Sequence, residues 1–112
     1  MNNKLFLGTY LDVIIDRKMG SRHPVHGFEY PINYGYIPNT QSGDGEELDA
    51  YILGITEPLE TFTGLCIAII HRLNDNDDKL VVVSPDQSFT DEKIRRITIF
   101  QEQWFKSKIL LK

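Results

Sequence analysis

Seven acidic residues gather in two short segments of the chain. They are Asp44, Glu46, Glu47 and Asp49 in the first segment, and Asp75, Asp77 and Asp78 in the second. Both segments lead into apolar runs that are typical of buried strands. Carboxylate oxygens are the ligands that Mg²⁺, Mn²⁺ and Ca²⁺ prefer in proteins. The pattern therefore predicts a site for a hard divalent cation, and solvated loops that favour solubility are the alternative.

Several basic residues lie beside these acidic segments or in a neighbouring loop. They are Arg17, Lys18, Arg22, Arg72, Lys79 and Lys106. Arginine presents a planar fork of donors to a phosphate group, and lysine presents a compact point charge. Metal-binding carboxylates together with arginine and lysine describe a site for a polyanion, most simply a phosphoanhydride. Exposed solubilising charge is the alternative for Lys18, but it suits Lys79 less well, because Lys79 stands between an acidic loop and a buried strand.

Other chemistries have weaker support in the sequence. His23 and His26 could ligate zinc in principle, but the chain has no HExxH motif, and its single cysteine, Cys66, lies in an apolar run. No P-loop, dinucleotide fingerprint or G-x-S-x-G motif is present. Tyr34 could be an aromatic residue of a strand or could place its hydroxyl beside a phosphate, and the sequence leaves both readings open.

The elements that must position these residues are mostly short strands. Apolar runs bounded by turn residues predict strands over residues 5–15 (one long or two short), 33–37, 48–53, 65–71 and 80–83, and residues 109–111 could add another. One helix is expected from about Asp91 to Lys106, because Ile94 and Ile97 begin an apolar stripe at helical spacing. Ser88 and Asp91 have the spacing of a capping box. These elements suggest a small closed barrel with the helix packed on it, which could bring both acidic segments to one rim.

The bulk composition is that of an ordinary globular protein. With 112 residues, the chain is expected to form one domain over residues 1–112 with a single modest core. The formal net charge of −4 argues against nucleic-acid binding, which normally uses a concentrated basic face. No apolar run approaches the ~20 residues that span a bilayer, so no membrane partner is expected. A lone cysteine cannot form an internal disulfide, and a cytoplasmic location is therefore expected.

One longer stretch of the chain resembles a known family. Residues 30–38 read YPINYGYIP, and residues 44–49 read DGEELD. Together they resemble the signature of the soluble, magnesium-dependent inorganic pyrophosphatases, which read YPxNYGYIP and then D-G-D-P-x-D before a strand. The similarity continues less tightly at Asp75, Asp77, Lys79, Phe105 and Lys106. In all, it extends from about Val13 to Lys106.

The resemblance implies a mainly β (α+β) fold, in which a small closed, OB-like barrel of five strands carries one C-terminal helix. It implies hydrolysis of inorganic diphosphate to two orthophosphates. Several Mg²⁺ ions, or Mn²⁺ in their place, would hold the substrate and activate water. It also implies assembly into a homo-oligomer.

The resemblance also assigns roles to single residues by motif position. The metal ligands would be Asp44, Asp49, Asp75 and Asp77, with Asp16 in the place of a metal-linked Glu after the first strand. The substrate-binding residues would be Arg22, Tyr34, Lys79 and Lys106. Glu46 would take the position of the carboxylate that orients the attacking water, with Asp44 and Tyr34 as the other members of the catalytic group.

Several departures from the family pattern bear on these expectations. Glu46 stands where the family has Asp, and Glu47 replaces the following Pro. The chain is shorter and lacks a hairpin that carries a Lys-x-Glu pair and then an Arg, which Arg22 or Arg17 could replace. Phe105 replaces the tyrosine of the family's Tyr-Lys pair. Two alternatives therefore stay open: a more open hydrolase of another phosphoanhydride or phosphate ester, and a non-catalytic module that binds phosphate or metal.

Overall fold

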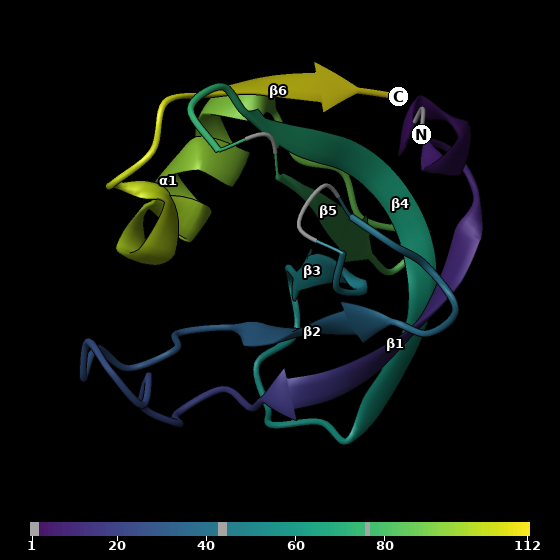
Figure 1. Cartoon of the computed structure of the whole chain (residues 1–112). Coiled ribbons are helices and arrows are strands. Elements are labelled where there is room, and N and C mark those ends of the chain that lie inside the picture. Colours follow the sequence, from purple (N-terminus) through teal and green to yellow (C-terminus); the bar gives the residue numbers. More distant parts are fainter. Residues whose placement is uncertain (1–2, 43–44, 76) are drawn as a thin grey trace.

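The computed structural model shows a small β-barrel with one helix against its side (Figure 1). It describes residues 3–42, 45–75 and 77–112. In chain order the elements are the 3₁₀ helix η1 (Asn3–Phe6), β1 (Tyr10–Arg17), β2 (Asn33–Ile37), β3 (Leu48–Ile52), β4 (Thr61–Arg72), β5 (Asp78–Val83), α1 (Asp91–Glu102) and β6 (Ser107–Leu111). The strands predicted over 33–37, 48–53, 65–71 and 80–83 are confirmed, and the possible last strand is present as β6.

Five strands close into the barrel in the order β1-β2-β3-β5-β4, because β4 also pairs with β1. β3 and β5 run parallel, whereas β1–β2, β2–β3, β4–β5 and β1–β4 are antiparallel. β6 adds to β4 outside this ring. A register shift between Cys66 and Ala68 marks a bulge in β4, and Figure 1 shows this long strand bending round the barrel. The predicted closed, five-stranded barrel with one packed helix is confirmed.

Two apolar layers follow from the alternation of side chains along the strands. The barrel interior holds residues such as Leu48, Ala50 and Ile52 of β3, together with apolar residues from the other four strands. The outer layer holds the residues between them, such as Tyr51, and is covered by Ile94 of α1. Because the side chains alternate, the polar residues of β3 and β5 that are not interior face the helix side. This alternation therefore places the polar side chains of these two strands on the helix side of the barrel.

The two ends of the chain differ from the sequence-based expectations. Residues 3–6 form η1 instead of the start of a strand, and β1 begins only at Tyr10. The helix ends at Glu102 instead of continuing to Lys106, because the chain turns there to enter β6. Its N-cap is Thr90, whose side chain accepts a hydrogen bond from the backbone N–H of Lys93, and not Ser88 of the expected capping box.

The contact between β1 and β2 is unusually close and shapes the site. A Cβ atom added at Gly35 would lie 2.0 Å from the carbonyl oxygen of Ile14, so only glycine allows the two strands to approach this closely. Directly beyond this contact, the pairing register of β1 and β2 shifts between Ile15 and Arg17. This bulge centres on Asp16, and bulges of this kind redirect side chains near functional sites.

Candidate active site

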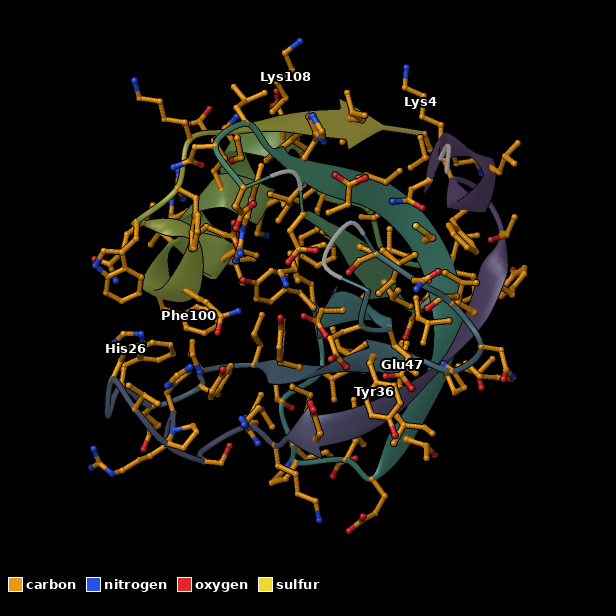
Figure 2. All side chains as sticks on the ribbon, in the orientation of Figure 1. Lys4, His26, Tyr36, Glu47, Phe100 and Lys108 are labelled. Carbon is orange, nitrogen blue, oxygen red and sulfur yellow. The ribbon has the colours of Figure 1, made fainter. Side chains whose placement is uncertain are left out.

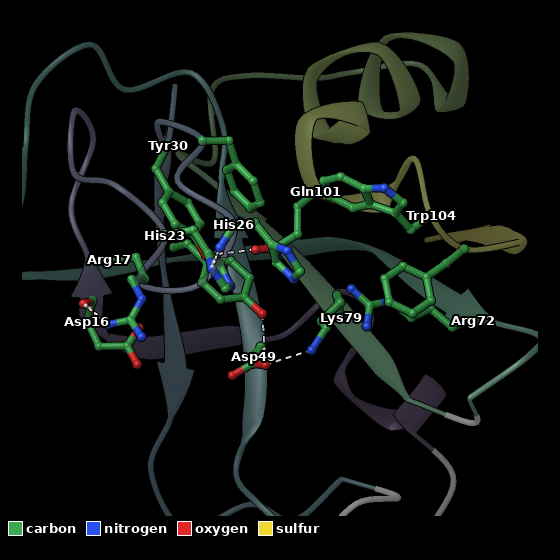
Figure 3. A pocket seen from close by; sticks show the side chains of 13 residues that line it. Asp16, Arg17, His23, His26, Tyr30, Asp49, Arg72, Lys79, Gln101 and Trp104 are labelled. Atoms are coloured by element: carbon green, nitrogen blue, oxygen red, sulfur yellow. Dashed lines mark hydrogen bonds and ion pairs between the residues drawn. The ribbon is translucent and has the colours of Figure 1, made fainter.

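A cleft of about 350 Å³ opens on the helix side of the barrel (Figure 3). Its charged lining residues come from four strands: Asp16 and Arg17 from β1, Asp49 from β3, Arg72 from β4 and Lys79 from β5. The rest of the lining comes from aromatic and histidine side chains of the β1–β2 loop (residues 18–32), from Tyr34 of β2, from Gln101 of α1, and from Trp104 and Phe105 just after that helix. The barrel thus brings residues that are far apart in the sequence into one cavity.

Lys79 connects the two acidic segments. Its Nζ atom donates to Asp49 Oδ2 at 2.6 Å and to Asp77 Oδ2 at 2.9 Å. Asp49 and Lys79 are direct partners in the parallel β3–β5 ladder, which explains why the segments meet. Burial alone would lower the pKa of Lys79, but the neighbouring carboxylates of Asp49 and Asp77 outweigh it and raise the pKa. Lys79 is therefore a fixed positive charge between two carboxylates.

Tyr34 contacts the same carboxylate. Its hydroxyl donates to Asp49 Oδ2 at 2.8 Å, and the side chain is buried. Burial, and then the negative charge of Asp49, raises the pKa of Tyr34 well above the usual value for tyrosine. The hydroxyl therefore stays protonated at neutral pH and can act as a hydrogen-bond donor. Of the two readings that the sequence left open for Tyr34, the structure places its ring in the outer apolar layer and its hydroxyl at the cleft.

Arg72 is a second buried cation in the cleft. Its guanidinium binds Glu102 of α1 through two hydrogen bonds, at 3.0 Å from Nε and 2.7 Å from Nη2. The remaining nitrogen, Nη1, lies 3.2 Å from Asp75 Oδ2 and 3.9 Å from Asp77 Oδ2. The guanidinium also packs over the ring of Phe105 at 3.7 Å from the ring centre. We refer to Tyr34, Asp49, Arg72, Asp77 and Lys79 together as the charged floor.

Asp16 and Arg17 stand at the bulge of β1, beside the charged floor. Burial raises the pKa of Asp16, the neighbouring Arg17 opposes this shift, and the negative charge of Asp49 adds to it. The effect of Asp49 shows that these two carboxylates act on one another across the cleft. A cation placed between them would relieve that repulsion.

The residues present fit a divalent cation in part. Asp49 and Asp77 converge on one cation already, the Lys79 ammonium, and Asp16 faces the same space with a carboxylate. Asp75 is engaged elsewhere, since it accepts from Arg72 and from the backbone N–H of Asp77. Among the described ranges 3–42, 45–75 and 77–112, no three His, Cys, Asp or Glu residues gather closely enough to hold a metal ion by themselves. Asp44, the other predicted ligand, lies outside the described residues.

Five predicted site residues in the described part of the chain do not line the cleft: Arg22, Glu46, Asp75, Asp77 and Lys106. Asp75 and Asp77 still bind the cleft residues Arg72 and Lys79. Arg22 is exposed and donates to the carbonyl oxygen of Gly27 at 3.1 Å, within its own loop. Glu46 and Lys106 are exposed. Lys106 lies beyond the helix, because α1 ends four residues earlier than the sequence predicts. In these positions, Arg17 lies nearer to the charged floor than Arg22 does.

The structure adds cleft residues that motif position did not assign to the site. Arg72 was visible only as a basic residue at the edge of the second acidic segment. Its partner Glu102 lies 30 residues away on the helix, and no local spacing joins the two. The sequence suggested only zinc binding for His23 and His26. In the structure, Nδ1 of His23 accepts hydrogen bonds from the backbone N–H groups of Val25 and His26, at 3.1 Å each. A histidine held in this way closes a tight loop.

Comparison with known proteins identifies the family to which this chain belongs. The family model for inorganic pyrophosphatase matches residues 13–109. The chain therefore belongs to the inorganic pyrophosphatase family.

Individual relatives agree with this assignment. An inorganic pyrophosphatase of Neisseria meningitidis is 35% identical over 85 residues, which cover 70% of this chain and 47% of that protein. One of Haemophilus influenzae is 38% identical over 68 residues, which cover 56% of this chain and 38% of that protein. The chain thus matches about half or less of the length of these relatives. Membership of this family implies a general dependence on divalent metal ions.

Solved structures share the fold. The inorganic pyrophosphatase of Ehrlichia chaffeensis superposes with a TM-score of 0.71 at 20% identity, over 91% of this chain and 85% of that one. The enzyme of Helicobacter pylori superposes with a TM-score of 0.70 at 18% identity, over 92% of this chain and 85% of that one. At this level of identity the likeness establishes the barrel itself.

Proposed function

We propose that this chain hydrolyses inorganic diphosphate to two orthophosphates with the help of Mg²⁺, for which Mn²⁺ can substitute. The observation that carries the proposal is the position of Lys79, whose ammonium joins a carboxylate from each acidic segment inside the cleft. Family membership over residues 13–109 supports the same activity. In this proposal Asp16, Asp49 and Asp77 hold the cations, with Asp75 and Asp44 as further candidates.

The chain's own residues then have separable tasks. Lys79 and Arg72 offset the negative charge of the phosphate groups, and their buried partners keep both cations in place before the substrate arrives. The Tyr34 hydroxyl donates a hydrogen bond to the carboxylate of Asp49, which also binds Lys79. When bound, divalent cations polarise the phosphates and make a water molecule acidic enough to serve as nucleophile near neutral pH. Glu46 keeps its proposed role in orienting that water.

The remaining features of the proposal concern the setting of the enzyme. We propose a homo-oligomer in the cytoplasm that has no nucleic-acid or membrane partner. Cys66 is buried, and burial raises the pKa of its thiol to about 11, so the thiol is inert and suits a reducing compartment. Within the described residues, no helix is long and apolar enough to cross a membrane.

The decisive experiment is orthophosphate release from diphosphate with Mg²⁺, with and without a chelator, for the wild type and for Asp49→Asn. We expect chelation to abolish activity and Asp49→Asn to reduce it about 100-fold or more, because the substitution removes a charge on which Lys79 and Tyr34 converge. Asp12→Asn is the matched control. Asp12 lies on β1, is exposed and pairs with Thr63 outside the cleft, so its loss should leave activity unchanged.

Two results would contradict the proposal. Full activity in Asp49→Asn would show that the chemistry takes place elsewhere. Tight diphosphate binding without turnover, under either Mg²⁺ or Mn²⁺, would instead identify a binding module that has kept the charged floor and lost catalysis.

A further inference from the structure

Four ring side chains form one wall of the cleft: His23, His26, Phe28 and Trp104. We call these four residues the aromatic rim. His26 stacks on Trp104 with ring centres 5.6 Å apart and planes 26° apart, and Phe28 stacks on Trp104 at 5.8 Å and 29°. His23 lies 4.8 Å from His26 and 4.9 Å from Phe28. Figure 3 shows His23, His26 and Trp104 above Asp49 and Lys79.

Phe28 packs against the outer apolar layer, but the other end of the rim stays in contact with solvent. Trp104 is 55% exposed, and His26 is exposed at the tip of the β1–β2 loop, which Figure 2 shows beneath Phe100 of α1. Large rings that remain in contact with solvent at the mouth of a polar cleft are typical of a recognition surface. An inorganic anion gives such rings nothing to stack on. The rim therefore indicates a ligand with a planar group of its own.

A continuous row of rings joins the rim to the charged floor. Tyr30 stacks with His23 at 6.3 Å and 17°, and with Tyr34 at 5.6 Å and 30°. Tyr34 in turn donates to Asp49, which binds Lys79. A ligand that has a flat ring at one end and a phosphate group at the other would meet a matching surface at both ends of this row.

One imidazole of the rim, that of His23, is uncharged. The pKa of His23 is lowered by desolvation and by the nearby His26 and Arg17, so its imidazole is neutral at physiological pH. A neutral imidazole offers a flat face for stacking without adding to the attraction for phosphate. Arg72 belongs to the charged floor, where phosphate groups would lie, and Arg17 lines the same cleft.

We propose that the aromatic rim binds the base of a nucleotide whose phosphate groups lie on the charged floor, so that the cleft takes nucleoside diphosphates as well as the inorganic ion. This inference rests on the proposed function, in which the floor binds phosphate. Stacking of a base on aromatic side chains strengthens binding by about 5- to 150-fold per base. The base would lie between the β1–β2 loop and the end of α1.

The test compares two ligands that carry the same phosphates, ADP and ribose 5-diphosphate, with Mg²⁺ and under conditions in which phosphate release shows that neither is consumed. Trp104 is the only tryptophan of the chain, so intrinsic fluorescence reports directly on the rim. We expect ADP to bind about tenfold more tightly than ribose 5-diphosphate and to quench the fluorescence, and ribose 5-diphosphate to leave it unchanged.

Variants locate the effect, with binding measured by calorimetry. Trp104→Ala should bring the affinity for ADP to within about twofold of that for ribose 5-diphosphate, and Trp104→Phe should retain most of the difference. His26→Ala should reduce the preference for ADP by a smaller factor. Ile99→Ala is the matched control, because Ile99 is 54% exposed on the same helix, outside the cleft, and its loss should leave both affinities unchanged.

Equal affinity of the wild type for the two ligands would overturn the inference, and so would a preference for ADP that survives Trp104→Ala and His26→Ala. The proposed function is judged separately by hydrolysis of inorganic diphosphate and its loss in Asp49→Asn. If hydrolysis is present and the two ligands bind equally, only the aromatic rim has been misread.

Discussion

The two sides of the cleft are built in different ways. Four of the five residues of the charged floor sit on strands, and Asp77 directly precedes β5. Hydrogen bonds of 2.6–3.2 Å tie these groups to one another, to Glu102 or to Asp75. The aromatic rim sits on a loop and beyond the end of a helix, and ring contacts of 4.8–5.8 Å hold it together. The floor is therefore fixed by strand register, whereas the rim can change without disturbing the barrel.

This difference indicates which positions can be substituted without disturbing the barrel. Lys79 reaches Asp49 because the two residues are partners in the β3–β5 ladder, and any sequence with this barrel brings those positions together. Trp104 meets His26 through the β1–β2 loop (residues 18–32) and the turn that follows Glu102, and no strand pairing sets this contact. We expect substitutions in the floor to affect stability, metal binding and catalysis, and substitutions in the rim to affect ligand preference.

The largest expected effect comes from the buried ion pair beneath the floor. In Glu102→Ala, Arg72 would be left buried without its main partner, and the Tyr51 hydroxyl would lose its acceptor at 2.5 Å. The expected loss is about 3–5 kcal/mol in the free energy of unfolding, which urea denaturation measures. Glu102→Gln keeps the shape of the side chain, should lose less, and provides a folded variant if the alanine form does not accumulate.

The same helix offers a control for that comparison. Glu92 pairs with Arg96 at 3.5 Å, but both side chains are about three-quarters exposed or more, at 83% and 74%. Glu92→Ala should therefore change the free energy of unfolding by about 0.5 kcal/mol or less. Equal losses in the Glu102 and Glu92 variants would show that the floor is not supported by its buried pair.

A middle-sized effect should separate metal binding from substrate binding. Lys79→Met removes the ammonium that occupies the space between Asp49 and Asp77. The freed carboxylates should bind Mn²⁺ about tenfold more tightly in calorimetry, because a competing positive charge is gone. In the same variant kcat/KM for diphosphate should fall about tenfold or more, because a phosphate contact is lost.

Lys108→Met is the matched control for this split. Lys108 projects from β6 at an edge of the molecule away from the cleft, as Figure 2 shows, and it is exposed. Neither quantity should change there. A fall in Mn²⁺ affinity in Lys79→Met would mean that the ammonium assembles the carboxylates and does not compete with metal ions.

Much of the fold could be predicted from the sequence, because strand patterns are local. The runs over 33–37, 48–53 and 80–83 alternate or are continuously apolar, and those strands are present. The helix end could not be predicted, since the apolar stripe continues past Glu102 and only the entry into β6 ends it. The meeting of Asp49 and Lys79 was indicated by motif position, but the Arg72–Glu102 pair depends on how the helix docks, which no spacing records.

The smallest expected effect concerns Asp16, at the boundary between the floor and the loop that carries the rim. Burial raises the pKa of this carboxyl above its value in the unfolded chain, so ionisation destabilises the folded state. The penalty is absent below the unfolded pKa, near 3.8, develops as the pH rises through the folded pKa, and is complete above it. Asp16 keeps much of its contact with solvent, which screens this penalty. Asp16→Asn should therefore raise the free energy of unfolding by about 0.5 kcal/mol or less at pH 7, seen as a slightly higher midpoint of thermal unfolding, and should have no effect at pH 3. If Asp16 also holds a cation, as proposed, Mg²⁺ should reverse the order at pH 7 by stabilising the wild type more than the variant. The same order with and without Mg²⁺ would place Asp16 outside the metal site and leave the floor to Asp49 and Asp77.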